Sequence, residues 1–269
     1  MSYSAIATIL GAAALELSGR IGSLSSKKRF GLFHTSSGGV IFKPRNFKDM
    51  HSLRVEEKKK VTKLYMPYRV RSSSFQPGFF RNYENITHLY MGWCYNIYTL
   101  PTSLGELTKL KYLSAKESNL NSLPETIGNL ENLVRLDLTD NNISTLPNTI
   151  GNLKNLKTLL LSGNNLKRIP RTIGNLSRLK ELNISNNRID KLPRSITNLK
   201  KLKSLDLRQN QLKELPVGIG TLKDLTFIGL GDNNWTMNFI DPIDFAEIIN
   251  NSNTPLVLLR SIMKQMRLA

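Results

Sequence analysis

Residues that could support catalysis or hold a metal ion are few and scattered in this chain. It has three histidines, His34, His51 and His88, and one cysteine, Cys94. A zinc site or a Cys–His nucleophile needs such residues as a recognisable set, and no such set is visible here. No Gly-x-x-x-x-Gly-Lys-Ser/Thr phosphate loop occurs either. The sequence therefore predicts no enzyme, no metal site and no cofactor, which leaves molecular recognition as the chemistry to look for.

Charge gives the first indication of what could be recognised. The chain has 38 Lys and Arg against 20 Asp and Glu, a net charge of +18. The excess is +11 over residues 1–83, +7 over 84–236 and zero over 237–269. The basic first segment could make weak contact with an anionic membrane or a nucleic acid. It could equally serve only to keep the protein soluble.

The elements that would position a binding surface are defined by a repeat. Proline follows Leu or Ile six times at an unbroken spacing of 23 residues, at Pro101, Pro124, Pro147, Pro170, Pro193 and Pro216. Each unit also carries Leu-x-x-Leu-x-Leu-x-x-Asn or a close variant, as in Leu133–Asn141. This period and pattern indicate a leucine-rich repeat solenoid. We expect an α/β fold, with a curved parallel β-sheet on one side and short helical or irregular segments on the convex side.

One asparagine recurs at the same place after each expected strand. An inward-pointing amide there can donate to and accept from backbone groups of adjacent turns. The predicted structural column is Asn141, Asn164, Asn187, Asn210 and Asn233. Ser118 and Cys94 occupy the position in the first two units, and we expect Cys94 to be a small buried side chain rather than a reactive thiol.

Three zones follow along the chain. Residues 1–83 are expected to be a basic leader, partly disordered, in which apolar residues from Met50 to Leu64 recur at helical spacing and indicate a helix that caps the first repeat. Residues 84–236 hold the repeats. Residues 237–269 are expected to form a C-terminal helical cap, because an open end would expose the apolar interior.

Cysteine usage bears on the compartment. A single cysteine cannot form the paired disulfides that close many secreted repeat arrays, which favours a reducing, cytoplasmic location. The apolar run at residues 5–17 is shorter than the roughly 20 residues needed to span a bilayer. Secretion as an effector and organelle targeting through the Ser-rich, acid-poor N-terminal stretch stay open as alternatives.

The repeat unit also carries a family resemblance. The segment Leu146–Leu166, Leu-Pro-x-x-Ile-Gly-Asn-Leu followed by Leu-x-x-Leu-x-Leu-x-x-Asn-x-Leu, resembles the intracellular leucine-rich repeats of scribble, erbin and the Ras-associated plant and animal proteins. Similar arrays occur in bacterial effectors and large viruses. The resemblance implies intracellular scaffold or adaptor work in signal transduction, and we expect a monomer that binds a protein partner.

The partner would bind the outward positions that alternate with the buried leucines on the concave sheet. Aromatic, charged, amide and apolar side chains at these positions are the candidate contacts: Tyr90, Tyr112, Arg135, Asp137, Leu160, Glu181, Asn183, Asp206, Arg208 and Phe227. Their mixed charges disfavour a nucleic acid on this face. The alternative is that several of them are only solvated.

Overall fold

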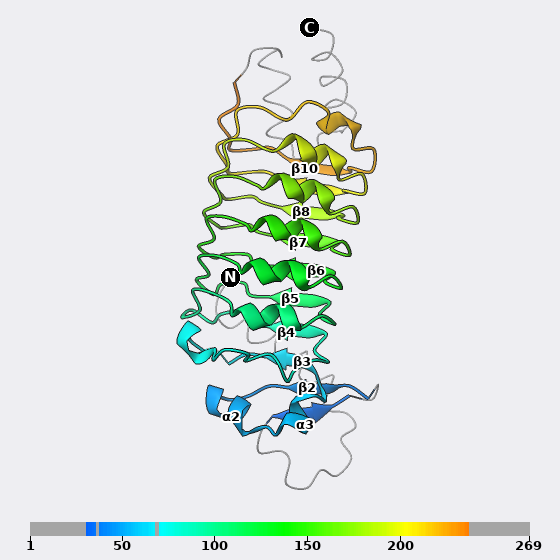
Figure 1. Cartoon of the computed structure of the whole chain (residues 1–269). Coiled ribbons are helices and arrows are strands. Elements are labelled where there is room, and N and C mark those ends of the chain that lie inside the picture. Colours follow the sequence, from blue (N-terminus) through cyan, green and yellow to red (C-terminus); the bar gives the residue numbers. More distant parts are fainter. Residues whose placement is uncertain (1–30, 36–37, 68–69, 237–269) are drawn as a thin grey trace.

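The chain is a solenoid in which every turn adds one strand to a single sheet. The computed structural model describes residues 31–35, 38–67 and 70–236. Strands form one side of the stack, and short 3-10 helices form the other (Figure 1). The first 30 residues of the predicted leader, and the predicted helical cap at 237–269, lie outside the described residues.

Ten strands follow one another in chain order across this sheet within the described residues. The first pair, β1 (Leu32–His34) and β2 (Val40–Phe42), is antiparallel, and each later pair is parallel. The later strands are β3 (Val61–Tyr65), β4 (His88–Tyr90), β5 (Tyr112–Ser114), β6 (Arg135–Asp137), β7 (Thr158–Leu160), β8 (Glu181–Asn183), β9 (Ser204–Asp206) and β10 (Phe227–Gly229).

The helices among the described residues are short and belong to two groups. Two α-helices, α2 (Phe47–Ser52) and α3 (Val55–Lys58), lie in the N-terminal segment. The 3-10 helices are η2 (Ser72–Ser74), η3 (Thr102–Glu106), η4 (Glu125–Asn129), η5 (Asn148–Asn152), η6 (Arg171–Asn175), η7 (Arg194–Asn198) and η8 (Ile219–Thr221). From η3 to η7 each begins directly after the repeated proline, which lacks a backbone N–H and therefore suits a helix start.

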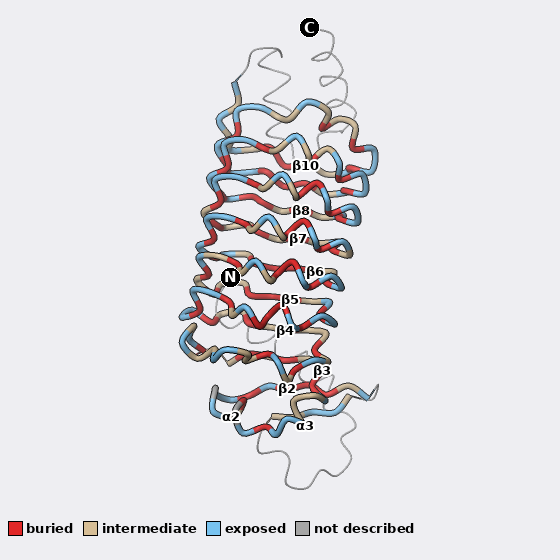
Figure 2. The backbone as a smooth tube through the Cα atoms, viewed as in Figure 1, coloured by how far each residue is buried: buried red, intermediate tan, exposed pale blue. Residues whose placement is uncertain are grey.

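The core runs without interruption through the stack, because each repeat supplies leucine and isoleucine side chains that the next turn covers. Leu136, Leu159 and Leu182 are fully buried at paired positions of consecutive strands. Figure 2 shows the buried segments on the inner side of successive turns. Each such side chain contributes about 1.5–3 kcal/mol when it leaves water, so the turns stabilise one another and none could stand alone.

A ladder of asparagine amides satisfies the backbone between turns. The Nδ2 of Asn164 donates to the carbonyls of Leu138 in the preceding turn, at 2.9 Å, and of Leu161 in its own turn, at 3.0 Å. Its Oδ1 accepts from the backbone N–H of Ile143 at 3.0 Å. The same pattern recurs at Asn141, Asn187, Asn210 and Asn233. The ladder ends at Ser118, whose hydroxyl reaches only the carbonyls of Met91 and Lys116.

The convex side depends on glycine where neighbouring 3-10 helices touch. A Cβ on Gly128 would lie 2.6 Å from the Cβ of Thr149 in the next helix, which is closer than real side chains approach. Thr197 occupies the equivalent position in η7, and the following helix differs. The helix η8 begins two residues later in its repeat than η7 does, after Gly218, whose φ is +95°. The repeat without this glycine is thus followed by a helix that starts later in its own repeat.

The N-terminal segment departs from the sequence expectation. Strand β3 pairs in parallel with β4, so the sheet continues across residue 84, where the repeats were expected to begin. The expected single helix from Met50 to Leu64 is wrong, because α2 and α3 end before Val61 and the residues from Val61 onward are a strand. Met50 and Leu64 are nevertheless buried in the same core as the repeats. The segment therefore covers the first repeat with strands as well as helical turns.

Candidate protein-binding face

Two columns of side chains alternate with the buried leucines on the concave sheet. Their order follows from the strand register, in which each residue pairs with its equivalent in the next turn. The first column is Lys63, His88, Tyr112, Arg135, Thr158, Glu181, Ser204 and Phe227. The second column is Tyr65, Tyr90, Ser114, Asp137, Leu160, Asn183, Asp206 and Gly229.

The N-terminal end of these columns is aromatic. We call Tyr65, His88, Tyr90 and Tyr112 the aromatic shelf. The rings of Tyr65 and Tyr90 are stacked with their centroids 4.3 Å apart and an angle of 12° between their planes. His88 stacks on Tyr112 at 5.9 Å, and Tyr90 lies 5.2 Å from Tyr112. All four side chains are half-buried, so the shelf offers continuous, partly desolvated ring surface, and aromatic residues of this kind often dominate binding energy.

Cations surround the aromatic shelf. The Nζ of Lys43 lies 4.6 Å from the ring centre of Tyr65, and the guanidinium of Arg135 lies 6.0 Å from that of Tyr112, both within range of a cation–π contact. Lys63 is next to His88 in the first column, and Lys111 directly precedes Tyr112. Within the described ranges, no carboxylate forms an ion pair with Lys43, Lys63 or Lys111. The positive charge of these three lysines is therefore not neutralised by an ion pair in the described part of the chain.

The pKa values of the ionisable groups in the shelf reflect partial burial and nearby positive charge. Burial lowers the pKa of His88, and the charges of Lys63 and Lys111 lower that pKa further. Burial also raises the pKa values of Tyr65 and Tyr90. At neutral pH the imidazole and both phenols are therefore uncharged, and the shelf can stack against a flat or apolar group.

Charges in the middle of the face are matched internally. Arg135 is 3.8 Å from the carboxylate of Asp137 and 3.9 Å from that of Glu181. Asp137 is only 8% exposed, and its Oδ1 accepts from the hydroxyl of Thr139 at 2.8 Å and from its backbone N–H at 3.3 Å. The alternation of buried and outward residues along the strand predicted an exposed Asp137. The carboxylate is instead buried, and its hydrogen bonds from Thr139 stabilise the turn after strand β6.

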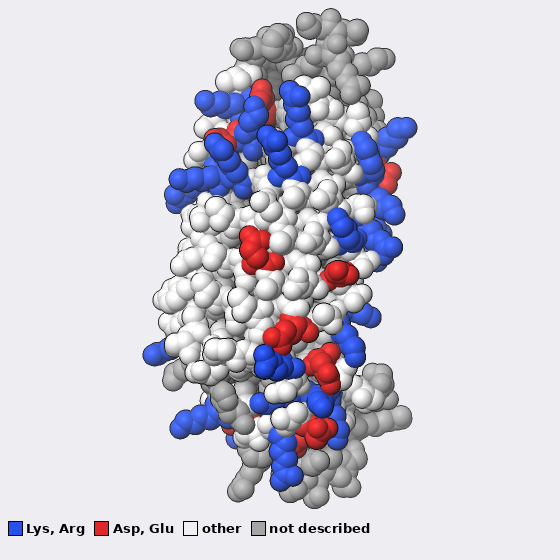
Figure 3. Space-filling view, in the orientation of Figure 1, with Lys and Arg blue, Asp and Glu red and all other residues white. Residues whose placement is uncertain are grey.

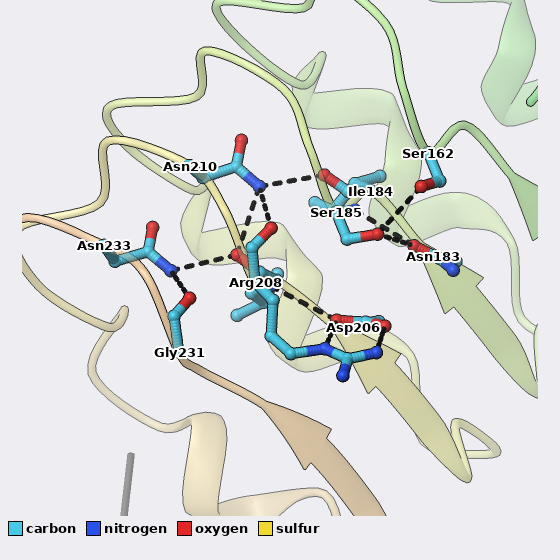
Figure 4. Close-up of polar contacts among 10 residues, drawn as sticks. Ser162, Asn183, Ile184, Ser185, Asp206, Arg208, Asn210, Gly231 and Asn233 are labelled. Carbon is cyan, nitrogen blue, oxygen red and sulfur yellow. Dashed lines mark hydrogen bonds and ion pairs between the residues drawn. The ribbon is translucent and has the colours of Figure 1, made fainter. Parts of the chain in front are cut away.

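The C-terminal part of the face is organised in the same way. Asp206 is 6% exposed, and its two carboxylate oxygens accept from Arg208 Nε at 2.9 Å and Nη2 at 2.6 Å (Figure 4). This ion pair raises the pKa of Arg208. The same guanidinium lies 5.9 Å from the ring of Phe227. Asp206 therefore holds Arg208 in place and is not the freely exposed carboxylate that its position in the sequence predicted.

Asn183 also uses its side chain within its own turn. Its Oδ1 accepts from the hydroxyl of Ser185 at 2.8 Å and from the Ser185 backbone N–H at 3.0 Å (Figure 4). Leu160 is half-buried between Asp137 and Asn183 in the second column. The candidate residues thus fall into two groups. The aromatic residues at one end face outward, whereas the polar residues at the other end form hydrogen bonds or ion pairs within their own turns.

Lys63 and Tyr65 belong to the face but were missed by the sequence reasoning. The segment Val61-x-x-Leu64-x-Met66 has the spacing of the repeated strand motif and could have revealed them. It lies 25 residues before Ile86 rather than 23, and neither the Leu-Pro pair nor the asparagine accompanies it. A search for the strand motif alone would have found β3.

Other chemistry is sparse in the described part of the chain. No group of three or more His, Cys, Asp or Glu side chains among those residues could hold a metal ion. Cys94 is buried, its thiol lies 3.4 Å from the carbonyl of Pro67, and burial raises its pKa to about 12, so the reactive thiolate is disfavoured. No helix within residues 31–35, 38–67 and 70–236 is long and apolar enough to cross a bilayer.

Stacked strands, an asparagine ladder and an open concave sheet define a solenoid repeat protein of the kind that presents a binding surface. Comparison of the sequence with family profiles gives the same assignment. A profile described as a leucine-rich repeat region matches residues 89–188 and 167–245, which is more than half of the chain. The chain belongs to the leucine-rich repeat family.

Solved structures with the same fold come from bacteria and plants. A leucine-rich repeat protein of Leptospira interrogans is 30% identical, with a TM-score of 0.63, over 71% of this chain and 47% of that one. The Arabidopsis receptor kinase HAESA, in complex with the peptide hormone IDA and the co-receptor SERK1, is 25% identical, with a TM-score of 0.57, over 79% of this chain and 36% of that one. This chain therefore spans less than half the length of either protein. No curated protein sequence matches it significantly.

Proposed function

We propose that the chain is a non-catalytic protein-interaction module that binds a protein partner on its concave face. The observation that carries this proposal is the aromatic shelf, with its half-buried rings and neighbouring unneutralised cations. Aromatic side chains and arginine contribute most of the energy at typical interfaces. Leucine-rich repeat domains in general bind protein partners through such surfaces.

The shelf also favours one kind of partner. Lys43, Lys63 and Lys111 supply positive charge around uncharged rings, so an acidic segment that carries an aromatic residue or proline would match both features. The HAESA structure contains a bound peptide hormone, which gives a precedent for peptide binding by a solenoid of this fold. The partner proposed here is a protein segment with acidic side chains.

In the cell this module would act as an adaptor or scaffold. The single cysteine and the resemblance to the scribble, erbin and Ras-associated repeats support an intracellular, monomeric signalling protein of that type. Membrane or nucleic-acid contact through the basic leader stays a separate prediction, because Lys27, Lys28 and Arg29 lie outside the described residues.

Affinity capture from the native cell tests the proposal, with quantification of each recovered protein. A Tyr112→Ala/Arg135→Ala variant removes one ring and one cation from the concave face. A Glu125→Ala/Asn129→Ala variant alters two exposed residues of the convex helix η4 and is the control. We expect the first variant to lose a partner that the second retains. Equal recovery by both variants, with unchanged circular dichroism, would contradict the concave site.

A further inference from the structure

A second surface with binding chemistry lies away from the concave sheet. A groove of about 930 Å³ runs along one edge of the solenoid, beside the starts of helices η6 and η7. Its apolar lining comes from equivalent Leu-Pro and Ile-Pro pairs of consecutive turns, with Ile169 and Leu192 buried and Pro170 and Pro193 half-buried. This volume is within the range of small-molecule sites, about 300–1,000 Å³.

Four cationic side chains line the same groove, together with one exposed carboxylate, Asp190: the cations are Arg168, Arg171, Lys191 and Arg194. Lys191 forms an ion pair with Glu214 at 3.0 Å. The three arginine side chains are exposed and have no ion pair or side-chain hydrogen bond among the described residues. Figure 3 shows Lys and Arg gathered over the upper part of the stack, with a few Asp and Glu among them. With Lys191 paired to Glu214, three arginines face the single carboxylate of Asp190 in this groove, so its net charge is positive.

The backbone fixes these cations on neighbouring turns. The hydroxyl of Ser195 donates to the carbonyl of Arg171 at 2.6 Å, which joins the start of η7 to that of η6. Arg168 and Lys191 are directly paired across an isolated parallel bridge. Equivalent residues of adjacent parallel segments lie about 5 Å apart, so the arginines are close enough to act on one ligand.

The basic surface ends abruptly in both directions. In the preceding turn the positions of Arg168 and Arg171 are occupied by Thr145 and Asn148, and in the turn after Arg194 the equivalent position is Val217. The cationic stretch therefore covers only two turns, about 10 Å along the solenoid axis. A nucleic-acid strand would need a longer basic track, whereas a compact ligand matches this length.

We propose that this groove binds a compact ligand carrying two or more phosphate groups, either as a free small molecule or as a lipid headgroup. Arginine binds phosphate through two parallel N–H···O bonds, and three arginines exceed what a single phosphate requires. The prolines and Ile169 contact the carbon skeleton that joins the phosphates. The site is independent of the concave face and of any partner bound there.

Calorimetric titration of the full chain with inositol hexakisphosphate at low salt is the direct test. The variant Arg168→Gln/Arg171→Gln/Arg194→Gln removes the site. The matched control, Lys157→Gln/Lys180→Gln/Lys203→Gln, removes the same charge from exposed positions that directly precede strands β7, β8 and β9. We expect the arginine variant to bind at least about tenfold more weakly than the wild-type chain, and the lysine variant to change less than about threefold. Thermal melts check that all three proteins are folded.

Two vesicle arms identify the source of the phosphates. Flotation with phosphatidylinositol-4,5-bisphosphate vesicles that fails in the arginine variant assigns a lipid headgroup. Hexakisphosphate binding without flotation assigns a soluble ligand. Absence of both interactions, equal weakening by the two triple variants, or equal flotation with phosphatidylserine vesicles of matched charge would overturn the proposal. Preferential binding of a single-stranded RNA over hexakisphosphate would also overturn it.

Discussion

The two ends of the concave face are built from similar residue types but use them differently. At the N-terminal end, the stacked rings of Tyr65, Tyr90 and Tyr112 lie near lysines that form no ion pair within the described residues. At the C-terminal end, Asp206 holds Arg208, and Arg208 in turn lies over Phe227. The N-terminal end therefore presents rings and lysines that can still contact a partner. At the C-terminal end, the charged and aromatic side chains already contact one another.

This difference teaches that position in a repeat does not determine availability for binding. Tyr90 and Asp206 belong to the same column and lie five turns apart. The tyrosine is half-buried with its ring accessible, whereas the aspartate is buried and hydrogen-bonded. Carboxylates in this column accept from the residue two positions later, so they stabilise the turn.

The largest expected effect is on stability at the C-terminal end. Asp206→Ala removes a buried carboxylate that accepts three hydrogen bonds from Arg208, and we expect the free energy of unfolding to fall by about 2 kcal/mol. Glu181→Ala breaks only a partly exposed ion pair at 3.9 Å and should cost less than about 0.5 kcal/mol. Urea denaturation measures both. Equal losses of unfolding free energy in the two variants would show that Asp206 stabilises the fold no more than Glu181 does.

The next effect is on partner binding and compares one aromatic residue from each end. Tyr90→Ala interrupts the ring stack with Tyr65 and should weaken binding of the captured partner by about tenfold, or 1.4 kcal/mol. Phe227→Ala removes a ring that Arg208 already covers, and should change the affinity by less than about threefold. Surface plasmon resonance with purified partner gives both values. A larger loss for Phe227→Ala would move the binding site to the opposite end.

Much of the fold could be predicted from the sequence because the same residue spacing recurs in every repeat, so each repeat supports the same structure. The spacing of the prolines and leucines predicted parallel strands, short helical or irregular convex segments, and the inward asparagines. It did not predict β3, because the 25-residue offset from Ile86 and the missing Leu-Pro pair hid the strand motif at Val61. It also did not predict the later start of η8, which follows the repeat in which Thr197 replaces the usual glycine.

The candidate site was predicted in outline but not in detail. Alternation placed Tyr90, Tyr112 and Arg135 on the concave sheet without indicating which groups are paired. The burial of Asp137 and Asp206 depends on short hydrogen bonds to Thr139 and Arg208 within the same turn. Such contacts depend on local side-chain conformation, which hydrophobic periodicity does not encode.

A smaller effect on partner binding should distinguish a lysine at the N-terminal end of the face from one at the C-terminal end. Lys111→Gln removes a cation beside the aromatic shelf, and Lys203→Gln removes one from the equivalent position four turns later. For an acidic partner we expect about threefold weaker binding for Lys111→Gln at 50 mM salt and almost no difference near 500 mM, because exposed charges are screened. Lys203→Gln should have little effect at either salt concentration. A similar loss for both would mean that overall charge, and not the shelf, attracts the partner.

The smallest expected effect concerns the stability contributed by His88. Its pKa in the folded chain is lowered by burial and by Lys63 and Lys111, so between that value and the unfolded value of about 6.5 the unfolded chain binds more protons. The contribution of His88 to stability is therefore complete above about pH 6.5 and is lost as pH falls through this window. Wild-type protein should lose slightly more stability between pH 7.5 and 5 than His88→Gln, as measured by urea denaturation.

The same imidazole can report the charge of whatever binds the shelf. An acidic partner placed beside His88 would offset Lys63 and Lys111 and raise the pKa of the imidazole, so binding would take up protons and strengthen as pH falls. A basic partner would lower that pKa, and a partner bound at the C-terminal end would leave it unchanged. NMR titration of His88 in free and partner-bound protein distinguishes the three cases, and only an upward shift agrees with an acidic segment on the aromatic shelf.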